Sequence, residues 1–173
     1  MAGLGILSLF SGDFALDWEP VPDGIPFRRF LAYVSGAILV TTGLGSLVPR
    51  AARAAMRALT IFMLLWVVLL RLPPVVAHPL DEGKWLGLGE TTVLFVGGWI
   101  TVLWITGQDR NPASPAAGKQ LRIARMLYGL SLPAIGLSHL MYSDGTASLV
   151  PPWLPFRLAF AYLTGASDIG SML

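Results

Sequence analysis

The sequence contains no cysteine, and this absence removes a whole range of chemistry. A chain without thiols forms no disulfides, no thiolate metal sites, no cysteine-ligated iron–sulfur cluster and no thiol redox relay. Histidine is nearly as scarce, since two residues in 173 are too few for a metal cluster built from imidazoles. The sequence therefore predicts no metal site.

Charged residues are also scarce. They make up 13% of the chain and hydrophobic residues 54%, whereas a soluble domain carries roughly 25% charged residues. With a mean hydropathy of +0.66, the chain has too little polar cover to enclose an apolar core in water. We therefore expect a lipid bilayer to surround much of the surface.

The few charges are distributed in a way that argues against nucleic acid as a partner. The net charge is +2, and the arginines lie at the ends of apolar runs rather than in one block. This pattern is typical of topology signals in membrane proteins. The N-terminus lacks the basic region and the small-residue cleavage site of a secretory signal peptide.

Four apolar runs approach the roughly 20 residues that a membrane-spanning helix needs. The second is closed by Arg71 and the prolines at 73 and 74. Two further runs, 1–11 and 158–173, are too short to cross. The sequence thus predicts an all-α, polytopic helix bundle with full spans at residues 30–48, 54–70, 85–107 and 123–142.

Basic residues gather in two junctions between these runs, at 50–57 and 110–125. Lysine and arginine favour the cytoplasmic side. We therefore expect a multi-pass protein of a bacterial inner membrane, with the arginine-rich loops and the N-terminus inside. The segments 18–22 and 150–155, rich in tryptophan and proline, are expected to form extended loops on the outer side.

The sequence repeats itself internally. The tripeptide PFR occurs at 26–28 and 129 positions later at 155–157, and AYVSGA at 32–37 returns as AYLTGA at 161–166. Four predicted spans separate the copies, so the repeats are parallel. Residues 1–120 are expected to form a first four-helix unit with a partial first helix, and 121–173 the start of a second. We interpret the incomplete second unit as truncation, the alternative being a partner that supplies the missing helices.

Small residues are concentrated on the repeated helix. Such residues let helix backbones approach closely in a membrane. The sequence predicts helix-packing roles for Ser35, Gly36, Thr164 and Gly165.

The same segment carries a family resemblance. The run at 32–37, followed by GLGSLVPRAARAA at 43–55, resembles the second-helix region of DoxX-like membrane proteins. The resemblance covers residues from about 10 to 107 and restarts near 136. It implies a four-helix unit. It also implies a link to quinone-coupled thiosulfate oxidation or to membrane complexes of oxidative-stress defence, although most members have no established activity.

A few ionisable residues lie inside or beside the predicted spans, where they are functional candidates by default. Glu90 and His139 lie at similar depths, so one hypothesis is a small polar pocket that binds a quinone-like or anionic ligand or exchanges protons with it. The alternative is that Glu90 pairs with an outer arginine and that His139 satisfies a carbonyl. Asp168 lies deeper, and we favour a structural role for it. The candidate site residues are Glu90, His139, Asp144 and Arg71.

No motif for a phosphate loop, zinc peptidase, serine hydrolase or dinucleotide fold is present. This lack favours a non-catalytic subunit or scaffold of a membrane complex, with another protein or a second copy as partner. No cofactor is evident, and a quinone is the one that the resemblance suggests. Two alternatives remain open: a small-molecule or ion transporter, and a membrane oxidoreductase subunit that uses Glu90 and His139 directly.

Overall fold

The computed structural model of the chain describes residues 1–15, 18–107 and 115–171. Within these ranges all regular structure is helical, which confirms the predicted fold class at that level. Arg110, which belongs to the predicted basic junction 110–125, and the last two residues of the run 158–173 lie outside the described ranges. The elements are α1 (Ala2–Ser11), α2 (Arg28–Gly45), α3 (Ala52–Leu65), η2 (Trp66–Arg71), α4 (Leu72–Ala77), α5 (Glu82–Ile105), α6 (Pro115–Met141), α7 (Ser143–Leu149) and α8 (Arg157–Gly170).

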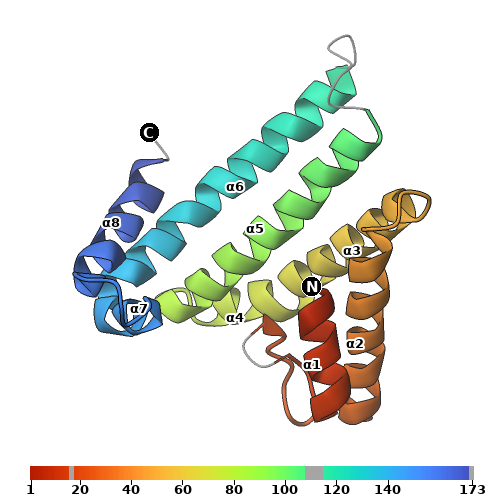
Figure 1. Cartoon of the computed structure of the whole chain (residues 1–173), viewed down its shortest axis with the longest axis horizontal. Coiled ribbons are helices and arrows are strands. Elements are labelled where there is room, and N and C mark those ends of the chain that lie inside the picture. The colour runs from red at the N-terminus through yellow and green to blue at the C-terminus, as the bar shows by residue number, and fades with distance from the viewer. Residues whose placement is uncertain (16–17, 108–114, 172–173) are drawn as a thin grey trace.

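Two helix pairs organise the structure. Helices α5 and α6 run side by side along most of their length, and α1 lies beside α2 (Figure 1). Helix α3 packs against both α2 and α5 and so joins the two pairs. At the other side of the molecule, α8 packs against the C-terminal half of α6, which contains an internal proline, Pro133 (Figure 1).

The core lies where α2, α3, α5 and α6 meet. The rings of Phe62 and Trp66 contact each other edge to face, with centroids 5.5 Å apart. Interlocked side chains of this kind fix the rotation of each helix about its axis. The core therefore sets which residues of α5 face α3 and η2. Its buried members are Leu39, Leu59, Met63, Trp66, Phe95, Val96 and Ala124.

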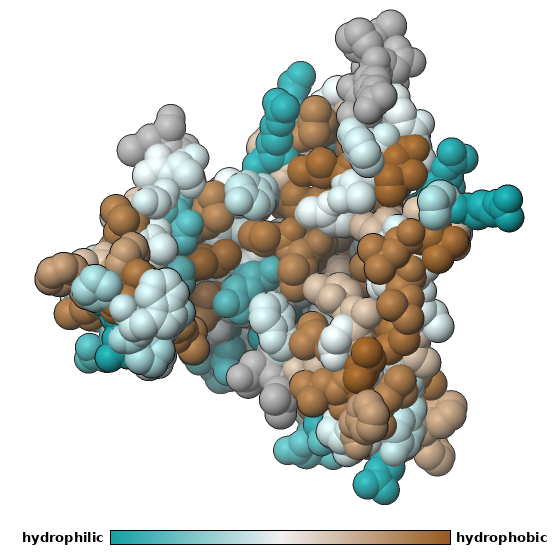
Figure 2. Space-filling view, in the orientation of Figure 1, coloured by the Kyte–Doolittle hydropathy of each residue, from teal (hydrophilic) through white to brown (hydrophobic). Residues whose placement is uncertain are grey.

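Large apolar side chains also cover the outside of the helices. Leu69 on η2, Leu130 on α6 and Leu163 on α8 are 63%, 63% and 61% exposed. Figure 2 shows apolar residues spread over the visible face, with strongly hydrophilic ones at several of its extremities and a smaller hydrophilic patch near its centre. Exposed apolar side chains on several helices are what a surface in contact with lipid would carry.

Two helices are long and apolar enough to cross a membrane. They are Ala52–Ala77, with 26 residues, and Glu82–Ile105, with 24 residues. The predicted spans 30–48 and 123–142 fall largely within α2 and α6. In the described ranges these two helices do not reach the same combination of length and hydropathy.

The prediction that Arg71 and the following prolines close the second span was wrong. The helix continues to Ala77 through the π-helical turn η2, which ends at Arg71. Proline lacks an amide hydrogen and its ring clashes with the carbonyl four residues earlier. Widening the turn before Pro73 and Pro74 relieves that clash, and both prolines then occupy the first turn of α4, where a missing amide costs little.

The two repeated helices make the same backbone contact. A Cβ atom at Gly36 of α2 would lie 2.9 Å from the carbonyl oxygen of Gly5 in α1. A Cβ atom at Gly165 of α8 would lie 2.8 Å from the carbonyl oxygen of Gly136 in α6. Each contact brings two helix backbones together at a point where only glycine fits.

The same two helices also share a strained entry. Phe27 precedes α2 with φ at 58°, and Phe156 precedes α8 with φ at 56°. A bulky residue rarely adopts this left-handed conformation, which costs on the order of 1–3 kcal/mol. In both places the phenylalanine carbonyl already accepts a helical hydrogen bond, from the amides of Leu31 and Phe160 respectively.

The contact at Gly36 predicts the effect of adding a methyl group there. In Gly36→Ala the new Cβ meets the backbone carbonyl of Gly5, which cannot move aside, as well as the side chain of Leu9, so we expect a loss of about 1–3 kcal/mol from overpacking. Thermal unfolding of the detergent-purified protein measures the change. Gly129→Ala on α6 is the control, because no atom lies within 4 Å of its Cβ position. Equal melting temperatures for the two variants would contradict the close contact.

Candidate functional site

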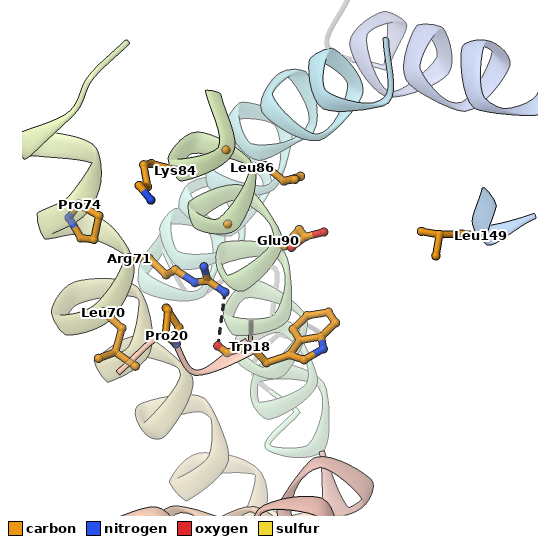
Figure 3. A pocket seen from close by; sticks show the side chains of 11 residues that line it. Trp18, Pro20, Leu70, Arg71, Pro74, Lys84, Leu86, Glu90 and Leu149 are labelled. Carbon is orange, nitrogen blue, oxygen red and sulfur yellow. Dashed lines mark hydrogen bonds between the residues drawn. The ribbon is translucent and has the colours of Figure 1, made fainter. Parts of the chain in front are cut away.

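A cavity of about 840 Å³ lies beside the N-terminal half of α5. Helix α5 forms one wall, η2 and α4 form another, and the connection between α1 and α2 crosses near its mouth (Figure 3). Its size falls in the range of about 300–1,000 Å³ that small-molecule sites occupy. The side chains that give it chemical character are Trp18, Arg71, Lys84 and Glu90.

Hydrogen bonds to Thr91 and Trp18 help to hold Arg71 on the cavity wall. Its Nε donates to the hydroxyl of Thr91 at 3.1 Å, and its Nη2 donates to the carbonyl of Trp18 at 3.4 Å. The Thr91 hydroxyl in turn donates to the carbonyl of Gly87 at 2.9 Å. Because Thr91 is 1% exposed, this chain of bonds anchors the guanidinium to the buried side of α5.

A glycine makes room for this guanidinium. A Cβ atom at Gly87 would overlap Nη1 of Arg71. The π-helical turn brings Arg71 to α5 from one side, and the missing side chain at Gly87 lets it lie flat against that helix. The position of the cation therefore depends on backbone geometry in two helices.

The other charged groups lie around Arg71. Lys84, one turn before Gly87, has a side chain that is 46% exposed, and its Nζ lies 3.9 Å from Oδ2 of Asp81. Glu90 is one turn beyond Gly87, and Figure 3 shows its carboxylate pointing away from Arg71. The cavity lining thus contains two cationic side chains and one anionic one.

Arg28 holds the α1–α2 connection, residues 12–27, in place at the first turn of α2. Its guanidinium forms ion pairs with Asp13 at 2.9 Å and with Asp23 at 3.5 Å. It also donates to the carbonyls of Val21, at 2.5 Å, and Pro22, at 2.9 Å. These bonds hold both ends of the connection, and so keep Trp18 at the cavity.

Glu19 anchors the same connection from inside. It is 2% exposed, and its carboxylate accepts hydrogen bonds from the Ser35 hydroxyl and, at 3.3 Å, from the amide of Ala15. Burial raises the pKa of Glu19 above its usual value, and the two hydrogen bonds offset part of that rise. Ser35, predicted as a packing residue, therefore also holds this connection on α2.

Glu90 and His139, predicted to meet, lie in different places. Glu90 lines the cavity, whereas His139 lies between α6 and α8, with its Nδ1 3.6 Å from Oδ2 of Asp168. That distance suits an ion pair when the imidazole is protonated. Asp144 is exposed in the first turn of α7. Of the four candidates, the structure brings together only Arg71 and Glu90.

Sequence reasoning missed Glu19, Gly87 and Thr91 as site residues. Gly87 and Thr91 are four residues apart and so share one face of α5, which is a signal that the sequence does contain. Glu19 lies in the segment 18–22, which the sequence predicts to be an outer loop, and nothing local marks its side chain as buried. Within the described ranges, no group of three or more histidine, aspartate or glutamate side chains could hold a metal ion.

The arrangement offers groups that can bind an anionic ligand. Arg71 presents a planar fork of donors, which fits the oxygens of a phosphate or carboxylate. Among the described lining residues, no hydroxyl or amine nucleophile lies beside a base. No protein-family model, curated protein or solved structure matches this chain.

The buried carboxylate of Glu19 predicts a pH dependence of stability. Because the pKa of Glu19 is raised in the folded state, the native protein binds more protons than the unfolded chain above pH 4.5. Stability should therefore fall as the pH rises from 4.5 through the folded pKa, and level off above it. Melting temperatures measured at several pH values check this. Glu19→Gln keeps the shape of the side chain but removes the titrating carboxyl, so its melting temperature should lack this contribution to the pH dependence. Identical pH profiles for the wild type and Glu19→Gln would contradict the prediction.

Proposed function

We propose that the chain is a multi-pass membrane protein of the DoxX-like kind, serving as a non-catalytic subunit or scaffold of a membrane complex. The observation that carries this proposal is a difference between α2 and α8. The two helices share a sequence pattern. Helix α2 is packed between α1 and α3, whereas the described neighbours with substantial contact to α8 are α6 and the short helix α7.

The difference is visible at corresponding positions. Ser35 and Leu39 on α2 are 5% and 0% exposed. Their counterparts on α8 are Thr164, which is exposed, and Asp168, whose side chain is 29% exposed. In lipid, a helix face with an exposed hydroxyl, beside a carboxylate that His139 of α6 covers only in part, is better covered by another helix than by acyl chains. A further helix, from another protein, from a second copy or from a continuation of this chain, is therefore expected against this face.

The membrane setting of the proposal has its own support. Apolar side chains cover the outside of the helices, and two helices have the length and hydropathy of membrane spans. The arginine-rich junction α2–α3, the C-terminal end of α5 and the basic N-terminal end of α6 lie towards one side of the molecule, and the α1–α2 and α4–α5 junctions lie towards the other (Figure 1). With the basic side in the cytoplasm, α7 faces the periplasm of a bacterial inner membrane.

The DoxX-like resemblance suggests the complex that such a subunit joins. Quinone-linked or oxidative-stress chemistry would then be carried by the partner, and this chain would hold it at the membrane. The cavity beside Arg71 supports a second candidate, a small-molecule or ion transporter. A role as oxidoreductase subunit loses support, because Glu90 and His139 do not share a site.

The absence of native cysteine makes the scaffold proposal directly testable. A benzophenone-maleimide attached at Thr164→Cys should, on illumination of native membranes, cross-link α8 to a second polypeptide. The control is Leu130→Cys, since Leu130 is 63% exposed on α6 but lies away from the proposed contact face. Equal cross-linking from both positions, together with substrate flux by the purified chain in proteoliposomes, would favour the transporter instead.

Single cysteines also test the proposed orientation. A membrane-impermeant maleimide should label Ser148→Cys in α7 from outside intact spheroplasts, because that end of the bundle is expected in the periplasm. Lys119→Cys, which is exposed near the start of α6, should react only after the membrane is opened. The reverse pattern would invert the topology, and full extraction of the protein by carbonate would remove the membrane assignment altogether.

A further inference from the structure

We propose that the cavity beside Arg71 binds the headgroup of an anionic phospholipid, with Arg71 contacting the phosphodiester. This inference rests on the membrane location proposed above, but not on the scaffold role. A partner helix at α8 and a lipid at Arg71 would occupy different surfaces, because α8 contributes no residue to the cavity lining.

The first support is the way in which the cation is built into the wall. Arg71 is placed by the π-helical turn, by the Thr91 hydroxyl and by the Trp18 carbonyl. Gly87 supplies the space that its Nη1 occupies. A guanidinium positioned in advance loses little side-chain entropy when it binds, and its fork of N–H groups matches two phosphate oxygens.

The second support is the mixed character of the lining. Leu70, Leu86 and Leu149 line the same cavity as Arg71 and Lys84. A free phosphate ion would leave most of a space of about 840 Å³ unfilled. A phospholipid would place its headgroup at the cations and lay the start of an acyl chain along the leucines.

The third support is the position of the cavity along the helices. Arg71 lies six residues before the end of α4 at Ala77, a rise of about 9 Å. Trp18 lines the mouth and is 40% exposed. Tryptophan at such a level is typical of the boundary between acyl chains and headgroups. With the bilayer boundary at the level of Trp18, the cation would lie within reach of a lipid phosphate.

Glu90 narrows the class of headgroup. The carboxylate of Glu90 in the lining disfavours a dianion such as a phosphomonoester, because it would repel two negative charges more strongly than one. A phosphodiester carries a single charge, and hydroxyl groups on its headgroup can donate to the carboxylate. Phosphatidylglycerol has both features, whereas phosphatidylcholine has neither a net charge nor a headgroup hydroxyl.

The matched pair of glycines on α5 provides the experiment. Gly87→Ala places a methyl group where Nη1 of Arg71 lies, and the flexible arginine can swing away without disturbing the backbone. Gly97→Ala meets nothing within 4 Å. Both variants keep the net charge, so non-specific attraction to anionic lipid is the same in all three proteins.

The full-length protein in neutral detergent would be titrated with phosphatidylglycerol, phosphatidylcholine and inorganic phosphate, with bound lipid counted by native mass spectrometry. We expect the wild type to prefer phosphatidylglycerol. Gly87→Ala should bind it about tenfold more weakly, as for the loss of one hydrogen bond to a charged group, and Gly97→Ala should match the wild type. Arg71→Lys keeps the charge but loses the planar fork of N–H donors, so it should also weaken binding of phosphatidylglycerol. It replaces Gly87→Ala as the test variant if Gly87→Ala does not fold.

Several results would overturn the proposal. Equal binding of phosphatidylglycerol by the wild type and by Gly87→Ala would do so, as would equal binding of the two phospholipids. Binding of inorganic phosphate that depends on Gly87 while lipid binding does not would assign the site to a free anion. Each of these outcomes leaves the membrane and scaffold proposals intact if the variants still fractionate with membranes and cross-link through Thr164→Cys.

Discussion

Two adjacent prolines impose the constraint on which the cavity depends. Pro73 and Pro74 cannot bond to the carbonyls of Leu69 and Leu70, so the helix widens into a π turn before them and then continues. That turn ends at Arg71. The cation is therefore carried by a regular, rigid element rather than by a loop. A straight α-helix through the same residues would turn Arg71 to another direction.

The connection between α1 and α2 couples the first helix pair to this cation. Arg28 fixes the connection at its ends, and Glu19 fixes its middle to Ser35 of α2. The carbonyl of Trp18, next to Glu19, then accepts a hydrogen bond from Arg71. A buried carboxylate is costly unless it is hydrogen-bonded. The hydrogen bonds from Ser35 and from the amide of Ala15 offset that cost for Glu19, and they tie the connection to α2.

Much of the fold could be predicted from sequence because apolar runs and small residues act locally. The helices follow the runs, and glycines 36 and 165 in the repeated motif lie at matching backbone contacts. The site was harder, because helical rise gives the depth of a residue but not its direction around the axis. Glu90 and His139 were therefore placed at one level, while the packing of α5 and α6 turns them to different surroundings. The burial of Glu19 depends on Ser35, sixteen residues away, and no local pattern reports it.

Helix α6 takes part in both halves of the molecule. Its N-terminal part contributes Ala124 to the core with α5, and its C-terminal part contacts α8 through Gly136. Pro133 lies between these regions and leaves the carbonyl of Gly129 without its usual helical donor. The helix therefore lacks one hydrogen bond at a position between the core and α8. A bend there would move α7 and α8 relative to the core, and because Leu149 of α7 lines the Arg71 cavity, it would also shift one wall of that cavity.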